Sequence, residues 1–277
     1  MPRVGLAFVY PRRAKQANEC SSRMPPPKPG AMRLSARVIL WAMVVGAALA
    51  VGHALWRGHI QVPERYNPWA ELNVDASPNW LTFMKLRRAQ ADPSSCLAAL
   101  ERTGVTYERV PDRVTGPGCG FQDAVRVHRG HRVRIGSPVI LSCRTALSFA
   151  MWERHGLQPA ADKNLQTPIV GIEHAGSYAC RNVNTGRDPE SVDARRSRHA
   201  TADALDVTGF VTQDGRRIRV ERDWQGGAAP ADTAPSAFLR DVHSMGCQFF
   251  TGVLGPDYNA VHRDHFHLEV GGWRMCS

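Results

Sequence analysis

Histidine, which binds metal ions and transfers protons near neutral pH, is concentrated at two places in this sequence. Three of the eleven histidines fall within the six residues of HRDHFH, 262–267. A fourth, His199, lies seven residues before Asp206 in SRHATADALD, 197–206. Two neutral imidazoles and one carboxylate around a zinc ion leave the fourth position for water, the pattern of catalytic rather than structural zinc sites. Such an ion lowers the pKa of that water towards about 7 and polarises a carbonyl group.

These side chains can converge only if neighbouring elements carry them. HFHLEV, 265–270, alternates as a strand does, so His265 and His267 are expected on the same face. A second strand carrying Asp206, with His199 in the loop leading into it, would complete the set. Spacing alone leaves two interpretations open, because an isolated histidine is more often a partly buried hydrogen-bonding residue than a metal ligand.

The other patterns predict a mixed fold. Strands are expected at 106–110, 124–135, 139–143 and 169–175, and Asp214-Gly215 predicts a tight hairpin turn within 204–220. Helices are expected after the capping Asp92, over Thr145–His155 and over 236–246. Hairpin-paired strands with helices between them indicate an α+β class, with an antiparallel sheet core and flanking helices.

The net charge of +10 would favour a nucleic-acid partner if the folded part carried it. Residues 1–37 hold eight Lys or Arg and one acidic residue, so the other 240 residues have a net charge of only +3. We therefore expect no nucleic-acid partner. Hydrophobic residues at 43% and charged residues at 22% exclude a polytopic membrane protein and a wholly disordered chain.

An apolar segment follows this basic tail. Residues 38–56 contain no Asp, Glu, Lys or Arg, and their length is close to the ~20 residues that span a bilayer. The basic residues before it predict a cytoplasmic N-terminus and an exported C-terminal part. A cleaved signal peptide is disfavoured because ALWRGH offers a poor cleavage site, and a buried core helix because of the basic flank.

These features divide the chain into four parts. We expect a basic, proline-rich cytoplasmic tail over 1–37, a single transmembrane anchor over 38–56, a linker over 57–91 and a folded domain over 92–277. The chain could start at Met1 or at Met32, which opens the compact charged lead-in MRLSAR.

Six cysteines follow the anchor, an even number that indicates disulfide bonds in an exported domain. Six cysteines allow fifteen pairings; we expect Cys143–Cys180 and Cys247–Cys276. A cysteine-based zinc site is disfavoured, because no two cysteines have C-x2-C or C-x4-C spacing.

Two motifs carry a family resemblance. SRHATADALD resembles the S-x-H-x-x-G-x-A-x-D signature of the M15-type zinc D-Ala-D-Ala peptidases, and Asp264-His265-Phe266-His267 is similar to their closing segment. The stretch from Cys96 to Cys276 resembles the extensin-like C-terminal domain of bacterial proteins. The matching segments are GCGFQDAVRV, IEHAGSYACRN and VLGPDYNAVHRDHFHLE.

The resemblance implies roles for eight residues. It makes His199, Asp206 and His267 the zinc ligands, with Asp264 as general base. His265 would orient the attacking water or stabilise the oxyanion. Arg144 would contribute to catalysis by contacting the substrate or the oxyanion, although an arginine at a helix start is usually solvated. Ser197 and Tyr178 would contact the substrate, although Ser197 could simply cap a turn and Tyr178 could only hydrogen-bond around Cys180.

The closing segment presents a geometric difficulty. Asp264 and His267 lie an odd number of residues apart, so a regular strand would place them on opposite faces. The strand must therefore start or bulge near Asp264; otherwise His265 is the better base.

Two residues depart from the motif. Ala202 stands where the motif has glycine, which requires that the backbone there avoid a positive φ. Arg198 adds a cation beside His199 that could disfavour the metal or contact an anionic substrate.

Together these features predict a membrane-anchored zinc metallopeptidase in the periplasm. It would lie in the bacterial inner membrane and cleave an amide bond in peptidoglycan peptides, as a carboxypeptidase or an endopeptidase. The alternative is a non-catalytic wall-binding module with a structural or vestigial metal site. A serine or cysteine hydrolase is disfavoured, because the sequence has no G-x-S-x-G and its exported cysteines are expected to pair.

Overall fold

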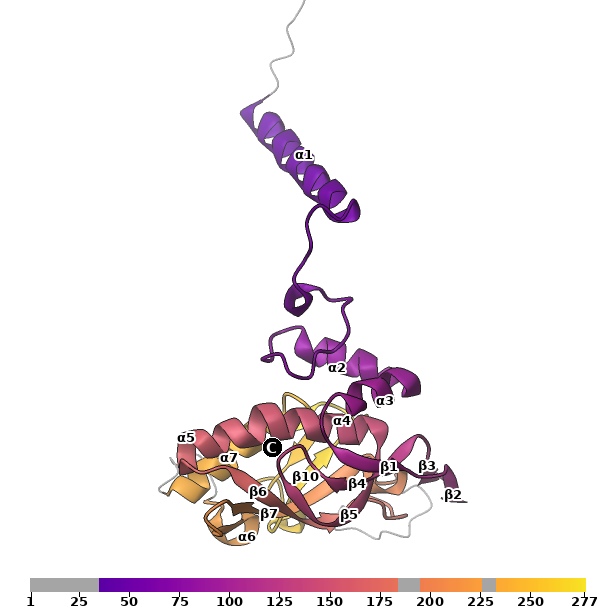
Figure 1. The fold of residues 1–277 in the computed structure, drawn as a ribbon, viewed down its shortest axis with the longest axis vertical. Helices are drawn as coiled ribbons and strands as arrows, with labels where there is room; N and C mark the ends of the chain where they lie inside the picture. Colours follow the sequence, from indigo (N-terminus) through magenta and orange to yellow (C-terminus); the bar gives the residue numbers. More distant parts are fainter. Residues whose placement is uncertain (1–34, 184–194, 226–232) are drawn as a thin grey trace, which may run out of the picture. The chain divides into compact units, whose positions relative to one another are not determined.

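The computed structural model describes residues 35–183, 195–225 and 233–277, and divides the chain into two compact units, Met1–Gln61 and Val62–Ser277 (Figure 1). In the first unit, helix α1 runs over Ala36–Trp56 with Ser35 as its N-cap, and none of its residues is buried. Its 21 residues are apolar enough to cross a membrane, which confirms the single apolar helix predicted over 38–56. Nearly all of the basic tail predicted over 1–37 lies outside the described residues.

A nine-stranded sheet forms the centre of the second unit. Its strands pair in the order β1-β4-β5-β6-β7-β10-β9-β11, with β8 also paired to β7. All pairs are antiparallel except β5–β6 and β9–β11, so the predicted α+β class is confirmed. The strands are β1 Thr106–Arg109, β4 Ala124–Arg129, β5 Arg134–Ser142, β6 Ile169–Gly176, β7 Ala204–Thr212, β8 Arg217–Arg219, β9 Gly252–Leu254, β10 Phe266–Glu269 and β11 Met275–Cys276. A separate ribbon pairs β2 Arg113–Gly116 with β3 Cys119–Phe121.

Helices flank the sheet. The helix α4, Cys143–Trp152, continues through a π-turn, η2 Glu153–Leu157, into α5, Gln158–Leu165, along one face of the sheet (Figure 1). The core between them is aromatic: Trp152 contacts the rings of Phe210 and Phe250, and its indole Nε1 donates to the Val242 carbonyl at 3.1 Å. The other helices are α2 Thr82–Ala91, α3 Pro93–Glu101, α6 Val220–Asp223 and α7 Ala234–Gly246, with one-turn helices η1 Glu64–Tyr66, η3 Arg198–Thr201 and η4 Ala260–His262.

The folded unit starts earlier than the sequence predicts. Residues 62–91, assigned to the linker, belong to the second unit, and α2 buries Leu86 and Ala89 in its core. The side chains of Asn79 and Lys85 donate to the carbonyls of Arg65 and Glu64 at 2.6 and 2.5 Å. The proline-containing segment that we predicted as a linker is instead hydrogen-bonded to α2 and its N-terminal flank.

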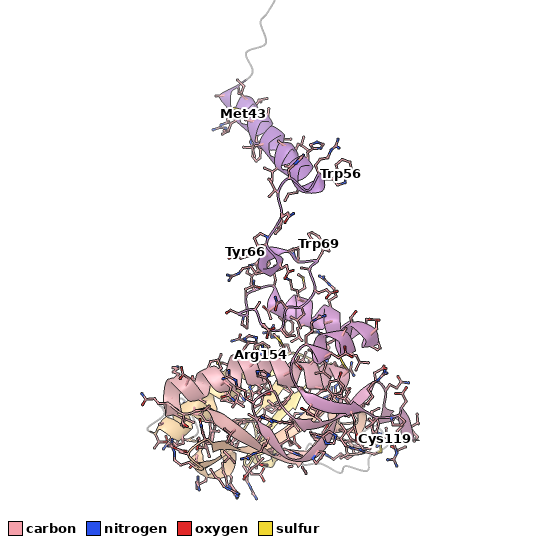
Figure 2. The ribbon with its side chains drawn as sticks, viewed as in Figure 1. Met43, Trp56, Tyr66, Trp69, Cys119 and Arg154 are labelled. Atoms are coloured by element: carbon pink, nitrogen blue, oxygen red, sulfur yellow. A yellow bond between two sulfur atoms is a disulfide. The ribbon has the colours of Figure 1, made fainter. Side chains whose placement is uncertain are left out.

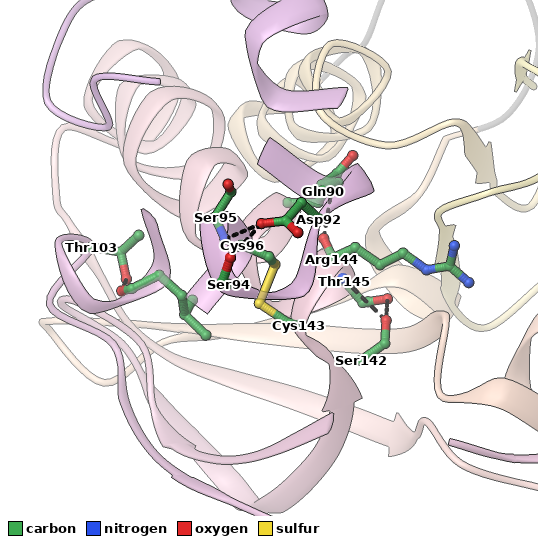
Figure 3. The surroundings of a disulfide bond; sticks show 12 residues. Gln90, Asp92, Ser94, Ser95, Cys96, Thr103, Ser142, Cys143, Arg144 and Thr145 are labelled. Carbon is green, nitrogen blue, oxygen red and sulfur yellow. Dashed lines mark hydrogen bonds between the residues drawn. A yellow bond between two sulfur atoms is a disulfide. The ribbon is translucent and has the colours of Figure 1, made fainter. Parts of the chain in front are cut away.

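All six cysteines that follow α1 are paired. The Cys247–Cys276 bond is as predicted, whereas the predicted Cys143–Cys180 bond is wrong. Cys143 opens α4 and pairs with Cys96 of α3, which packs against it (Figure 3). Cys180 follows β6 and pairs with Cys119 of β3. No cysteine among these six remains free for a metal.

Removing the bond between α3 and α4 should lower the free energy of unfolding. The Cys96→Ala/Cys143→Ala variant is expected to lose about 2–4 kcal/mol, because the bond closes a 47-residue separation in the unfolded chain. Urea unfolding with the other two bonds intact measures the loss. An unchanged unfolding midpoint would show that this bond contributes nothing to stability.

Candidate metal centre

Two adjacent strands and the turn before them bring the predicted ligands together. The antiparallel register of β7 and β10 places Asp206 directly opposite His267, and directly opposed residues share one face of a sheet. The turn η3 leads into β7 and carries His199. One ligand atom from each of these three residues lies within 4.8 Å of the others, so the predicted convergence is present.

The contacts within this group are close. His199 Nε2 lies 3.1 Å from Asp206 Oδ2 and 3.1 Å from His267 Nδ1. His267 Nδ1 lies 2.9 Å from Asp206 Oδ1. All three residues are buried, so water cannot easily replace these contacts.

The outer nitrogen of each imidazole is held by an acceptor. His199 Nδ1 donates to the Ser177 carbonyl, and His267 Nε2 donates to Glu269 Oε2 at 3.0 Å. Since a carbonyl and a carboxylate only accept, these bonds leave a lone pair on each inner nitrogen. Two imidazole lone pairs and a carboxylate therefore face one another at one point, and none of the three groups supplies a proton donor to the others.

The charges show how strongly this point attracts a positive charge. Burial opposes ionisation of Asp206, but its hydrogen bonds with His199 and His267 hold the pKa of its carboxyl well below the usual value. Burial also opposes the His267 imidazolium, but bonds to Asp206 and Glu269 raise the pKa of His267 to about 9. Without a metal ion, a proton occupies the position that a cation would take.

The donor set suits a divalent metal. Two imidazoles and a carboxylate form a three-ligand set that leaves a coordination position open. The bonds to Ser177 and Glu269 are the outer partners that fix ligand orientation in metal sites. A second cluster, His243 with Cys247 and Cys276, cannot serve in the same way, because its two sulfurs are joined in a disulfide.

Ser177 and Glu269 were not predicted from the sequence. Glu269 lies two residues after His267 on β10, so strand alternation alone could have placed the two side chains on one face. Ser177 accepts the His199 hydrogen bond through its main-chain carbonyl. Every residue type has such a carbonyl, so the sequence could not indicate this contact.

The candidate base residues lie beside the centre. The strand β10 begins at Phe266, so Asp264 lies in the preceding turn, as its proposed role required. Asp264 Oδ1 bonds to His265 Nδ1 at 2.8 Å, and His265 Nε2 lies 3.6 Å from Asp206 Oδ1. His265 therefore faces the centre, and Asp264 is hydrogen-bonded to the other nitrogen of its ring.

A cleft of about 520 Å³ opens onto this centre. His262, His265 and His267 form part of its lining. Burial and the nearby His267 and His265 lower the pKa of His262 to about 4, so it is a neutral wall residue. The remaining lining includes four arginines and two exposed aromatic residues: Arg181, Arg195, Arg196, Arg198, Tyr258 and Trp273.

Arg144 does not line this cleft. Its guanidinium pairs with the buried carboxylate of Asp203, which also accepts from the hydroxyls of Ser142 and Thr201 at 2.7 and 2.6 Å. It lines a different cavity, next to the Cys96–Cys143 bond (Figure 3). Asp203 directly precedes β7, so its pairing with Arg144 anchors the turn that carries His199. We had predicted that Arg144 contacts the substrate or the oxyanion.

The two predicted substrate residues also have structural partners. Ser197 caps η3 by accepting from the His199 backbone N–H at 3.3 Å, although it lines the cleft. Tyr178 bonds to the Thr115 hydroxyl and packs edge-on against Phe121. It is not among the residues that line the cleft.

The two departures from the motif are resolved differently. Ala202 has φ of 55°, so the expectation that its backbone avoids a positive φ is wrong. The reversal between η3 and β7 requires this conformation, because the Ala202 N–H donates to the His199 carbonyl and its own carbonyl accepts from Ser142. Compared with glycine, alanine in this conformation lowers the free energy of unfolding by about 1–2 kcal/mol. Arg198 reaches away from His199 and donates to the Gly271 carbonyl at 2.6 Å.

Metal affinity should fall as the pH falls. Because the pKa of His267 is about 9 without metal, a binding ion must displace that proton. The apparent zinc Kd is expected to rise about tenfold for each pH unit below 9. Chelator competition at several pH values measures this slope, and a flat profile would contradict it.

The same proton makes the free energy of unfolding of the metal-free protein depend on pH. The folded pKa of His267 lies above the ordinary value of 6.5, so its contribution to stability is complete below pH 6.5. This contribution is lost as the pH rises through 9. Metal-free protein should therefore unfold more easily at high pH, where zinc protects best.

Comparisons with known proteins place most of the second unit, from α3 onward, in one family. The family described as extensin-like protein C-terminus matches residues 94–277. No curated protein and no solved structure matches the chain.

Proposed function

This chain belongs to the extensin-like protein C-terminus family, and on that premise we propose that it is a membrane-anchored zinc hydrolase that cleaves an amide bond in peptidoglycan peptides. The observation that carries the proposal is the meeting of three buried acceptors, His199, Asp206 and His267, at one point. Each imidazole is held in the required tautomer by an acceptor outside the centre. Such a set favours a catalytic site over a purely structural one, because it leaves a position open.

Residues beside the centre are suited to proton transfer. When bound, zinc would supply a water of lowered pKa and would polarise the scissile carbonyl. His265 would accept the proton at Nε2 and return it to the leaving amine. The bond to His265 lowers the pKa of Asp264, so Asp264 stays ionised, and its role is to fix the His265 ring through Nδ1.

The cleft lining favours an anionic peptide. Among the described lining residues, Glu269 is the only acidic side chain, and it bonds to His267. Arg181 and Arg195 are exposed and form no ion pair with a carboxylate of the described residues. Peptide stems that carry free carboxylates would match this charge. The exposed Trp273 ring adds an apolar surface at the rim, as an attached sugar requires.

The apolar helix and the paired cysteines support the proposed location. The helix α1 would cross the bacterial inner membrane with the basic tail in the cytoplasm. Three disulfides in the second unit fit the oxidising periplasm, where peptidoglycan is found. The first property to determine is which bond of the peptide is cleaved.

The test is hydrolysis of defined muropeptides by the full chain in detergent. Zinc-loaded protein should release a peptide or amino acid that mass spectrometry identifies, and chelation followed by zinc should abolish and restore the release. The alternative function, a non-catalytic wall-binding module, is favoured by the exposed Trp273 and by the strained Ala202. Binding to purified sacculi that survives chelation, with no product at any zinc level, would establish that alternative and refute hydrolysis.

A further inference from the structure

Exposed apolar side chains of the second unit fall into two groups. Within the described part of Val62–Ser277, four large ones line the cleft: Tyr258, Val261, Trp273 and Met275. Five others lie within its first 23 residues: Val62, Tyr66, Trp69, Trp80 and Met84. We call these five the tryptophan patch. Val114 lies apart from both groups.

Hydrogen bonds hold together the segment that carries the tryptophan patch. Asn79, which precedes Trp80, bonds to the carbonyl before Tyr66 at 2.6 Å. Lys85, which follows Met84, bonds to the Glu64 carbonyl at 2.5 Å. Arg88 bonds to the carbonyl before Trp69. These bonds tie η1 and its flanks to α2, and Tyr66 and Trp69 lie on the side of α2 away from the sheet (Figure 2).

The tryptophans are far more exposed than folding requires. Trp69 is 82% exposed and Trp80 is 81% exposed, although many other apolar residues of the unit are buried. Tryptophan combines a large apolar ring with one N–H donor, and it is enriched where a protein meets the interface of a bilayer. Such exposure is costly in water alone and is explained by a partner that covers the rings.

The charges beside the tryptophan patch favour a phosphate-bearing surface. Glu71 and Asp75 pair with Arg102 and Arg154, so these carboxylates are compensated. The Arg65 guanidinium lies over the Tyr66 ring at 5.0 Å from its centroid. Exposed Arg65, Arg87 and Arg88 then outnumber the exposed carboxylate of Glu64, so the segment that carries the tryptophan patch keeps a positive charge.

The chain itself limits how far the tryptophan patch can lie from a membrane. The helix α1 ends at Trp56 and the second unit begins at Val62. The residues between them, 57–61, can reach at most about 20 Å when fully extended. If α1 spans a bilayer, Val62 cannot leave the vicinity of the headgroups.

We infer that the tryptophan patch is a membrane seat, in which Trp69 and Trp80 insert into the headgroup interface of the bilayer that holds α1. The inference rests on the proposed membrane anchoring and extends it, since the anchor alone would leave the domain free to tumble on its linker. The seat fixes one face of the domain against the lipid surface.

Tryptophan quenching in nanodiscs tests this contact. The full chain is reconstituted in phosphatidylethanolamine and phosphatidylglycerol whose acyl chains are brominated near the headgroup, with unbrominated lipid as reference. A Trp41→Phe/Trp56→Phe background removes the tryptophans of α1 and leaves five of the seven. Up to about two fifths of the emission should be quenched, the share of two tryptophans among five.

Matched variants separate the seat from the anchor. Adding Trp69→Phe/Trp80→Phe should abolish the quenching, whereas adding Trp273→Phe, at an equally exposed residue of the cleft, should preserve it. All three rings are exposed, so these changes should not unfold the domain. Unchanged quenching without Trp69 and Trp80, or none with them, would overturn the seat and point to a protein partner. Separately, chains that retain Trp41 and Trp56 should show their quenching; its absence would overturn the anchor and the seat together.

Discussion

Replacing His199 or His267 by alanine should reduce the zinc content from about one ion per chain to none and abolish hydrolysis. Either change removes one of the three side chains that meet at the candidate centre. Two remaining ligands cannot hold the ion in a three-ligand site with an open position. Rate losses of several orders of magnitude follow, because the ion carries most of the stabilisation of developing charge.

Elemental analysis of the purified full chain, beside rates on a muropeptide substrate, measures this result. His262→Ala is the matched control: its ring centroid lies 5.7 Å from that of His267, but it is not in the ligand group. It should retain zinc. Circular dichroism and free-thiol titration exclude unfolding as the cause. Full zinc content in both His199→Ala and His267→Ala would refute the centre.

Replacing His265 by alanine should lower kcat by about 10²–10⁴ while zinc content stays unchanged, since general-base catalysis contributes about that factor. Its Nε2 faces the centre but lies 3.6 Å from the nearest Asp206 oxygen. Asp264→Asn should have a smaller effect, about tenfold, because Asp264 acts through His265 Nδ1. Rates across pH distinguish the roles: His265→Ala should remove the acidic limb of the profile, which Asp264→Asn should only displace.

The reverse ranking would reassign the base. If Asp264→Asn were the more damaging change and His265→Ala left the pH profile intact, Asp264 would be the proton acceptor, as the family resemblance implied. Loss of zinc in either variant would instead make that residue part of the metal centre.

Local patterns predicted most of the fold. The β-hairpin around Asp214-Gly215, the helix ending at Gly246 and the strand around His267 all carry their signals within a few neighbouring residues. The linker prediction failed because Leu86 and Ala89 are buried by contacts that no local pattern announces. The Cys143–Cys180 prediction failed for the same reason: partner choice depends on which helices pack together.

The candidate centre was predicted in its side chains but not in its surroundings. His199, Asp206 and His267 belong to motifs, and their convergence follows from the pairing of two strands. The pairing of Arg144 with Asp203 was not predicted, because Asp203 lies 59 residues away and is buried. The Ser177 carbonyl was invisible, because any residue type supplies one.

The Cys119–Cys180 bond makes the geometry of the candidate metal centre depend on the oxidation state of the chain. Cys180 lies three residues after Ser177, and the Ala179 N–H between them donates to the His199 carbonyl at 3.1 Å. The segment that orients His199 is thus fastened to β3 only once this bond has formed. A chain still reduced, before export, lacks that fastening and should bind zinc about 10–100-fold more weakly. Metal acquisition would therefore follow oxidation. If the proposed function and location hold, the enzyme would become active only on the side of the membrane where the proposed substrate lies.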